Sequence, residues 1–202
     1  MSNFSAKPAY SALSGFAQEI FSVSASSCAA MRSISAKLRE MGVTVIAGED
    51  CVTVKSTGRL RKVNIKTMPY PGFPTDMQPQ FAAALCLANG ASVITEGIYD
   101  NRFKYLTELR KMGAQVQVDG RTAMIEGVEK LCGAPVAACD LRAGAAMVIA
   151  GLCAEGTTEV EDVHYIERGY EDFVGKLRGL GADIALVSCP DEPERVKSIN
   201  VC

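Results

Sequence analysis

The chain has 202 residues, a mass of 21.5 kDa, a formal net charge of −2 and a pI near 5.6. This acidic balance provides no basic surface, so we expect neither nucleic acid nor an anionic membrane as the main partner. The longest apolar segment, 143–154, contains two glycines and is too short to span a bilayer. A small-molecule or protein partner is favoured.

Eight cysteines show no C-x-x-C pair, and the single histidine, His164, has no metal-ligand spacing to any of them. Cys86 and Cys153 lie inside apolar helical patterns, where a reduced thiol behaves as a small hydrophobic side chain. The sequence therefore predicts no metal site, structural free thiols and a cytoplasmic location.

Residues 1–30 form an unassigned N-terminal segment, rich in Ser and Ala, in which Phe16–Phe21 could form a short helix. From residue 31 the pattern sharpens. Apolar residues recur at helical spacing up to Met41, and Gly42 stands where a glycine ends a helix. Two alternating strands are expected next, at 43–47 and 51–55.

A proline-rich stretch, Thr67–Gln78, organises the middle of the chain. Its three prolines fix φ and lack an N–H, so neither a helix nor a central strand can continue through it. A stiff loop is predicted. Thr75 and Asp76 then occupy N-cap positions before a helical pattern over Met77–Asn89. One interpretation is that Asp76 only caps this helix.

The helix ending at Gly42 returns at Gly113 and Gly181, each time followed by a β-type run, with a period of about 70 residues that indicates a repeated supersecondary unit. The second and third units both read β-α-β-α-β-β. We expect an α/β fold of the α+β type, with a lobe over 31–202 that divides into a partial unit and two full ones, at 31–60, 63–128 and 134–201.

The expected elements of the second unit are strands at 63–67, 92–96, 115–119 and 122–126 and helices at 77–89 and 103–112. Those of the third are strands at 136–139, 158–163, 183–187 and 196–200 and helices at 141–155 and 170–180. The first helix of each unit is apolar on nearly every face, so we expect both to point inward and be buried, with sheets outside.

The aligned repeats place Asp76 and Asp140 at equivalent helix N-termini, on one rim. Helix N-termini favour anions, and a nearby arginine can bind carboxylate or phosphate. Arg102, Arg142 and Arg168 stand at strand-to-helix corners of the same units. The alternative for each arginine is an ordinary surface salt bridge.

Four motifs resemble the C-terminal portion of the UDP-N-acetylglucosamine 1-carboxyvinyltransferase family, over about residues 32–190. They are Tyr-Pro-Gly-Phe-Pro-Thr-Asp-Met-Gln at 70–78, Ile-Thr-Glu-Gly-Ile-Tyr-Asp-Asn-Arg-Phe at 94–103, Asp-Leu-Arg-Ala-Gly-Ala-Ala-Met-Val-Ile-Ala-Gly at 140–151 and Glu-Arg-Gly-Tyr-Glu at 167–171. The resemblance implies a fold of two lobes, each of three such units. It also implies transfer of the enolpyruvyl group of phosphoenolpyruvate to the 3′-hydroxyl of UDP-N-acetylglucosamine, a step of peptidoglycan synthesis. No cofactor is implied.

The resemblance also implies site roles. Asp76 matches the aspartate that contacts the sugar hydroxyl and takes its proton, and Asp140 matches an acidic residue beside the reacting centre. Ile98 matches a UDP-sugar contact, and Arg102 lies in the same motif. By the same resemblance, the phosphoenolpyruvate-binding residues are Arg142 and Arg168.

The family's other lobe has no counterpart here, and Gly97 replaces a residue that usually carries a hydroxyl. We therefore expect a fragment that needs the missing N-terminal lobe and is inactive alone. Two alternatives stay open, namely a 5-enolpyruvylshikimate-3-phosphate synthase-like transferase and a non-catalytic binding or regulatory fragment. The acidic balance disfavours a third relative of the fold, an RNA 3′-phosphate cyclase.

Overall fold

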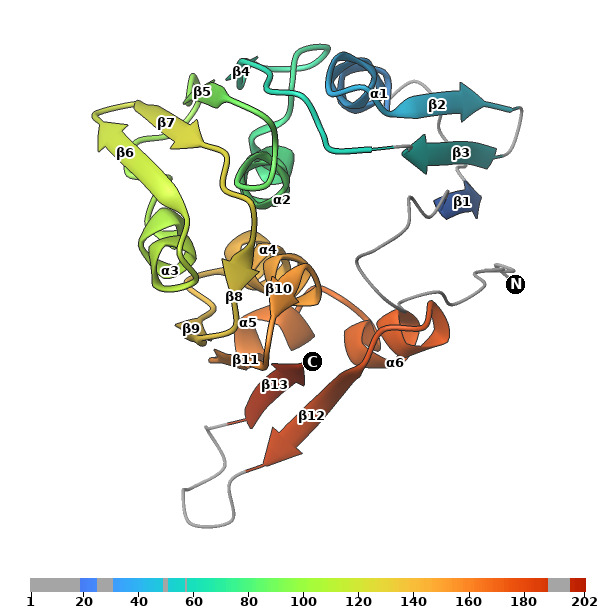
Figure 1. Cartoon of the computed structure of the whole chain (residues 1–202), viewed down its shortest axis with the longest axis vertical. Helices are drawn as coiled ribbons and strands as arrows, with labels where there is room; N and C mark the ends of the chain where they lie inside the picture. The colour runs from blue at the N-terminus through green and yellow to red at the C-terminus, as the bar shows by residue number, and fades with distance from the viewer. Residues whose placement is uncertain (1–18, 25–30, 49–50, 57, 189–196) are drawn as a thin grey trace.

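A computed structural model describes residues 19–24, 31–48, 51–56, 58–188 and 197–202. The three larger sheets stand at the outside of the molecule. Helices α2 (Gln78–Leu85) and α4 (Leu141–Leu152) lie between them near the centre (Figure 1). The arrangement of sheets outside and apolar helices inside confirms the predicted fold class.

The second unit contains β4 (Ile65–Lys66), the 3₁₀ turn η1 (Thr75–Met77), α2 (Gln78–Leu85), β5 (Ala91–Thr95), α3 (Tyr105–Lys111), β6 (Gln115–Asp119) and β7 (Thr122–Glu126). Its sheet has the order β4-β5-β7-β6, with β4 parallel to β5 and the other pairs antiparallel. The β6–β7 hairpin has the predicted bounds and turns at Gly120, whose φ is +55°.

The third unit contains β9 (Pro135–Ala137), α4 (Leu141–Leu152), β11 (Thr158–Glu161), α5 (His164–Glu167), α6 (Phe173–Gly179), β12 (Ile184–Ser188) and β13 (Lys197–Val201). Its sheet has the order β9-β11-β13-β12, with β9 parallel to β11 and the other pairs antiparallel. The connectivity equals that of the second unit, so the predicted repeat is confirmed in these two units.

The first unit contains β1 (Glu19–Ser24), α1 (Arg32–Glu40), β2 (Thr44–Ala47) and β3 (Cys51–Ser56). Strand β1 runs antiparallel to β3, as β5 does to β7 and β11 to β13. It therefore takes the place of the second strand of the unit. The predicted helix over Phe16–Phe21 is wrong at residues 19–21, which belong to β1, while 16–18 lie outside the described residues.

The three units share one helix ending. Gly42, Gly113 and Gly181 have φ values of +90°, +92° and +92°, a left-handed conformation that glycine adopts without strain. In each case the amide of the next residue donates a hydrogen bond to a carbonyl in the last helical turn. An arginine of that turn also donates from Nε to the carbonyl six residues later: Arg39 to Val45, Arg110 to Val116 and Arg178 to Ile184.

Helices α2 and α4 pack against each other. Most residues of both are buried and none is exposed, which confirms their predicted inner position. Gly144 lets α4 approach its neighbours closely, because a Cβ there would lie 2.7 Å from Ile166 Cγ1 and 2.9 Å from Ala138 Cβ. This packing fixes the start of α4 against the rest of the third unit.

Several predicted boundaries differ from the structure. The helix expected over 141–155 ends at Leu152, since Ala154–Glu155 form a short strand, β10, parallel to β8 (Leu131–Cys132). The helix expected over 170–180 begins at Phe173, because Asp172 adopts a left-handed φ of +45° and accepts a hydrogen bond from the Gly175 amide. The helix expected over 77–89 ends at Leu85.

Within the described ranges, no helix combines the length and the apolar character that crossing a membrane requires.

Candidate active site

Four charged side chains meet where the second and third units join. Asp76, on η1, receives Arg102 Nη2 at 3.4 Å on one carboxylate oxygen and Arg142 Nη2 at 3.0 Å on the other. Arg102 also lies 3.9 Å from Asp140 through Nη1. We call Asp76, Arg102, Asp140 and Arg142 the rim cluster. The side chains of both aspartates are about half exposed, at 53% and 41%.

The two aspartates of the rim cluster differ in their local bonds. Asp140 is the N-cap of α4, and its Oδ1 accepts hydrogen bonds of 2.8 Å from the amides of Arg142 and Ala143. Asp76 makes no capping bond to η1 or to α2. The interpretation that Asp76 only caps its helix is therefore wrong, and its carboxylate faces two guanidinium groups instead.

The guanidinium of Arg142 is held by partners from both units. Its hydrogen bond to Asp76, together with one to the Tyr170 hydroxyl, outweighs partial burial and raises the pKa of Arg142 above its usual value. Arg142 thus stays a cation whose remaining N–H groups can receive an anionic ligand. The sequence analysis does not predict this contact of Tyr170.

Arg168 is not among the residues that the ion pairs of the rim cluster join. It follows α5 directly, its side chain is exposed, and its guanidinium carbon stands 5.4 Å from the centre of the Tyr165 ring. The next residue, Gly169, packs on Leu141 at the start of α4, where a Cβ would lie only 2.6 Å from Leu141 Cδ2. Arg168 is therefore placed beside the same helix N-terminus, without a direct contact to the cluster.

Ile98 is half-buried in the loop that follows β5, and its amide donates a 2.8 Å hydrogen bond to Glu96 Oε1. Glu96 is only 1% exposed. Its carboxylate also accepts the hydroxyls of Thr67 at 2.7 Å and Thr75 at 2.9 Å. Sequence reasoning missed this role. The alternation of β5, whose Ser92 and Ile94 are buried, could have indicated an inward Glu96.

Burial opposes ionisation of Glu96, yet its hydrogen bonds from Thr67, Ile98 and Thr75 prevail and hold the pKa of the carboxyl below its ordinary value. A buried carboxylate is stable when several donors satisfy it. Glu96 is thus an anion inside the protein that binds only neutral donors among the contacts described for it.

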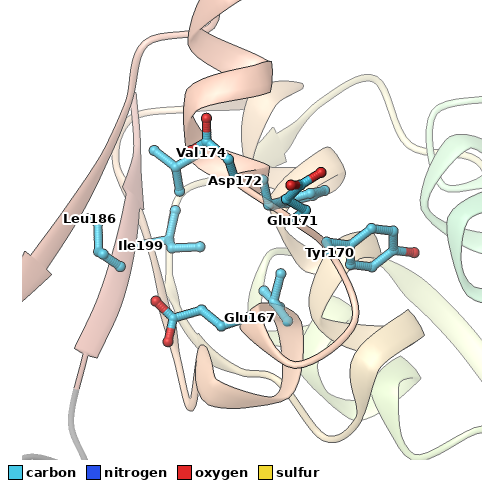
Figure 2. Close-up of a pocket in the computed structure, with 9 residues that line it drawn as sticks. Glu167, Tyr170, Glu171, Asp172, Val174, Leu186 and Ile199 are labelled. Atoms are coloured by element: carbon cyan, nitrogen blue, oxygen red, sulfur yellow. The ribbon is translucent and has the colours of Figure 1, made fainter.

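A cavity of about 300 Å³ lies between α6 and strands β12 and β13 (Figure 2). Its floor includes Ile166 and Ile199, and the carboxylates of Glu167, Glu171 and Asp172 stand around it. Tyr170 lines one side, and Figure 2 shows its hydroxyl directed away from the hollow. Three carboxylates disfavour a phosphorylated ligand in this cavity, whereas the two arginines of the rim cluster favour one.

Within the described part of the chain, His, Cys, Asp and Glu side chains form no group of three that could hold a metal ion. Cys86, Cys132, Cys139 and Cys202 form no disulfide bond. Burial raises the pKa of Cys86 to about 12, so this thiol is a poor nucleophile near neutral pH.

Known proteins resemble this chain in sequence and in fold. A family model described as EPSP synthase (3-phosphoshikimate 1-carboxyvinyltransferase) matches residues 19–177. UDP-N-acetylglucosamine 1-carboxyvinyltransferase 3 of Caldanaerobacter subterraneus subsp. tengcongensis is 64% identical over 154 residues, which cover 76% of this chain and 37% of that protein. The chain thus spans little more than a third of the length of this relative.

The crystal structure of the enolpyruvyl transferase NikO from Streptomyces tendae superposes with a TM-score of 0.73 and 34% identity, over 79% of this chain and 37% of that one. An EPSP synthase from Acinetobacter baumannii superposes with a TM-score of 0.54 at 16% identity, over 84% of this chain and 56% of that one, and shows likeness of fold alone. The resemblance to UDP-N-acetylglucosamine 1-carboxyvinyltransferases is confirmed, and the chain belongs to the EPSP synthase family of carboxyvinyltransferases.

Proposed function

We propose that the rim cluster is part of the active site of a UDP-N-acetylglucosamine 1-carboxyvinyltransferase, which transfers the enolpyruvyl group of phosphoenolpyruvate to the sugar 3′-hydroxyl and releases phosphate. The observation that carries this proposal is the Asp76 carboxylate, which makes no helix cap and stands half exposed between Arg102 and Arg142. The names of two relatives support UDP-N-acetylglucosamine as the acceptor and a carboxyvinyl group as the group transferred.

Asp76 acts as the general base in this proposal. Each of its oxygens already accepts one guanidinium N–H and keeps a second lone pair for a hydroxyl group. The proline loop and the two arginines hold the carboxylate in place, and a base fixed within hydrogen-bond reach of a hydroxyl can remove its proton as the oxygen attacks. In this proposal Arg102 and Ile98 contact the UDP-sugar.

Phosphoenolpyruvate carries a phosphate and a carboxylate, and both suit guanidinium groups. We assign them to Arg142, within the cluster, and to Arg168, beside the N-terminus of α4. Asp140 stands next to the reacting centre, where its bonds to the α4 amides keep it oriented.

The cluster is open to solvent, and charged groups act more strongly where water is excluded. We therefore propose that turnover requires a second surface that closes over the rim, and that this chain alone turns over little. We place this reaction in the cytoplasm, the compartment in which cysteines without disulfide bonds, such as those described here, are usual.

A binding experiment tests the proposal. Isothermal titration of the chain with UDP-N-acetylglucosamine should give saturable binding, and Asp76→Ala should weaken it by about 10- to 100-fold, because a hydrogen bond to a charged group contributes about 1.5–3 kcal/mol. Glu129→Ala is the matched control, since Glu129 also pairs with an arginine, Arg59, but lies outside the cluster and outside the loops that carry Asp76 and Ile98. Its affinity should equal that of the parent chain.

Shikimate 3-phosphate separates the alternatives in the same titration. Binding of this compound in place of the UDP-sugar would overturn the proposal in favour of the shikimate-type transferase. Binding of neither compound, by a chain that remains folded, would contradict a substrate role for the cluster and favour a non-catalytic fragment.

A further inference from the structure

The loop that carries Asp76 depends on one buried side chain. The carboxylate of Glu96, at the end of β5, accepts the Thr67 hydroxyl where the loop begins and the Thr75 hydroxyl directly before Asp76. It also receives Gln78 Nε2 at 3.4 Å, two residues after Asp76. Both ends of the proline loop are thus bound to the same carboxylate.

The same carboxylate binds the loop that carries Ile98. Its Oε1 accepts the amides of Ile98 at 2.8 Å and Tyr99 at 3.2 Å. Thr67 strengthens this connection, because its hydroxyl accepts the Gly97 amide at 2.8 Å while it donates to Glu96. Gly97 itself must be small, since a Cβ would lie 2.3 Å from the Thr67 carbonyl oxygen.

The burial and charge of Glu96 set it apart from an ordinary structural acid. It is 1% exposed, and its five donors are two hydroxyls, one side-chain amide and two backbone N–H groups, with no lysine or arginine among them. The donors come from the two loops that carry proposed site residues. A buried anion without such donors would be strongly disfavoured, so the loops and the carboxylate fix one another.

We propose that Glu96 is a positioning residue: its buried carboxylate fixes the loop of Asp76 and the loop of Ile98 relative to each other. Glu96 itself does not touch the substrate. Glu96 holds the two loops in place whether or not the chain binds a substrate. Only the expected effect on UDP-N-acetylglucosamine affinity rests on the proposed function.

Hydrogen–deuterium exchange tests the proposal directly. In Glu96→Ala, amide exchange in 67–78 and 97–99 should rise about tenfold or more, because the donors lose their shared acceptor. Glu96→Gln should show a smaller increase, since its amide oxygen still accepts while its NH₂ opposes the donors at the other oxygen. UDP-N-acetylglucosamine affinity should fall in the same order.

Glu108→Ala is the matched control. Glu108 is also a buried carboxylate of the second unit, at 8% exposure, but it binds Lys111 and the Ala137 amide and touches neither loop. Its loss should destabilise the fold and leave exchange in 67–78 and 97–99 at the level of the parent chain.

Thr75 provides a second pair of variants that disturbs the fold less. Thr75→Val removes one hydroxyl donor to Glu96 and should raise exchange around residues 74–78, and Thr75→Ser should restore it. Exchange in both loops that is unchanged in Glu96→Ala and Thr75→Val, or that rises equally in Glu108→Ala, would overturn the proposal. If the parent chain binds no UDP-sugar, the proposed function fails, and the exchange result still decides the role of Glu96.

Discussion

The start of α2 and the start of α4 occupy equivalent places in the repeat, and each carries an aspartate, yet the two aspartates do different things. Asp140 has an extended backbone with a φ of −161° and gives its carboxylate to two amides of α4. Asp76 lies inside the turn η1, whose cap position is taken by Pro74. Proline has no side-chain acceptor, so the turn goes without a side-chain cap and Asp76 faces outward to the arginines.

Within one repeated motif, Asp140 therefore has a structural role, and the Asp76 carboxylate is left for ligand binding or catalysis. The third unit uses its carboxylate to fix a helix, which in turn presents Arg142. The second unit fixes its loop by prolines and by Glu96, and this arrangement keeps its aspartate available. Single substitutions can disturb the second or the third unit separately.

The largest effect should come from moving α4 itself. Gly144→Ala places a methyl group 2.7 Å from Ile166 Cγ1 and 2.9 Å from Ala138 Cβ, and such overpacking typically costs about 1–3 kcal/mol. Urea denaturation measures the loss. Gly179→Ala, in α6, is the control and should raise the stability of the fold. No atom lies within 4 Å of the added Cβ, and alanine favours a helix over glycine by up to about 1 kcal/mol. Equal stability of both variants would contradict the close packing.

A smaller effect distinguishes the two aspartates. Asp140→Ala should lower the free energy of unfolding by about 1 kcal/mol, as expected for a lost N-cap. Asp76→Ala should lower it by less, since exposed ion pairs contribute about 0–1 kcal/mol. Chemical denaturation of the two variants checks the order. A larger loss in Asp76→Ala would mean that Asp76 is the structural member of the pair.

The smallest effect concerns pH. Because the folded protein lowers the pKa of Glu96, this group stabilises the fold above its unfolded pKa of about 4.3, and the contribution disappears as pH falls through the lower folded value. The stability difference between the parent chain and Glu96→Gln should therefore shrink as pH falls from neutral into that acid range. Denaturation curves at several pH values measure it. A difference that grows on acidification would show that the folded pKa is raised.

Much of the fold follows from local patterns. Gly42, Gly113 and Gly181 marked the three helix ends, and the β6–β7 hairpin was predicted with its observed bounds. The two-residue pair β8 and β10 was not, because Leu131–Cys132 and Ala154–Glu155 are too short to show a period and meet only through tertiary packing.

The site was predictable in part. The repeat placed Asp76 and Asp140 on one rim, and the structure joins them through Arg102. Whether Asp76 caps a helix or faces the arginines depends on backbone angles that the amino-acid sequence does not specify. The contact of Tyr170 with Arg142 joins α4 to a loop of the same unit by packing, which no spacing rule indicates.

The most direct test is a crystal structure of the chain with UDP-N-acetylglucosamine bound. Our account predicts that the sugar 3′-hydroxyl oxygen lies within about 2.6–3.2 Å of an Asp76 carboxylate oxygen, with Arg102 and Ile98 beside the same ligand. A sugar that occupies another face of the molecule, with Asp76 still paired only to its two arginines, would contradict it.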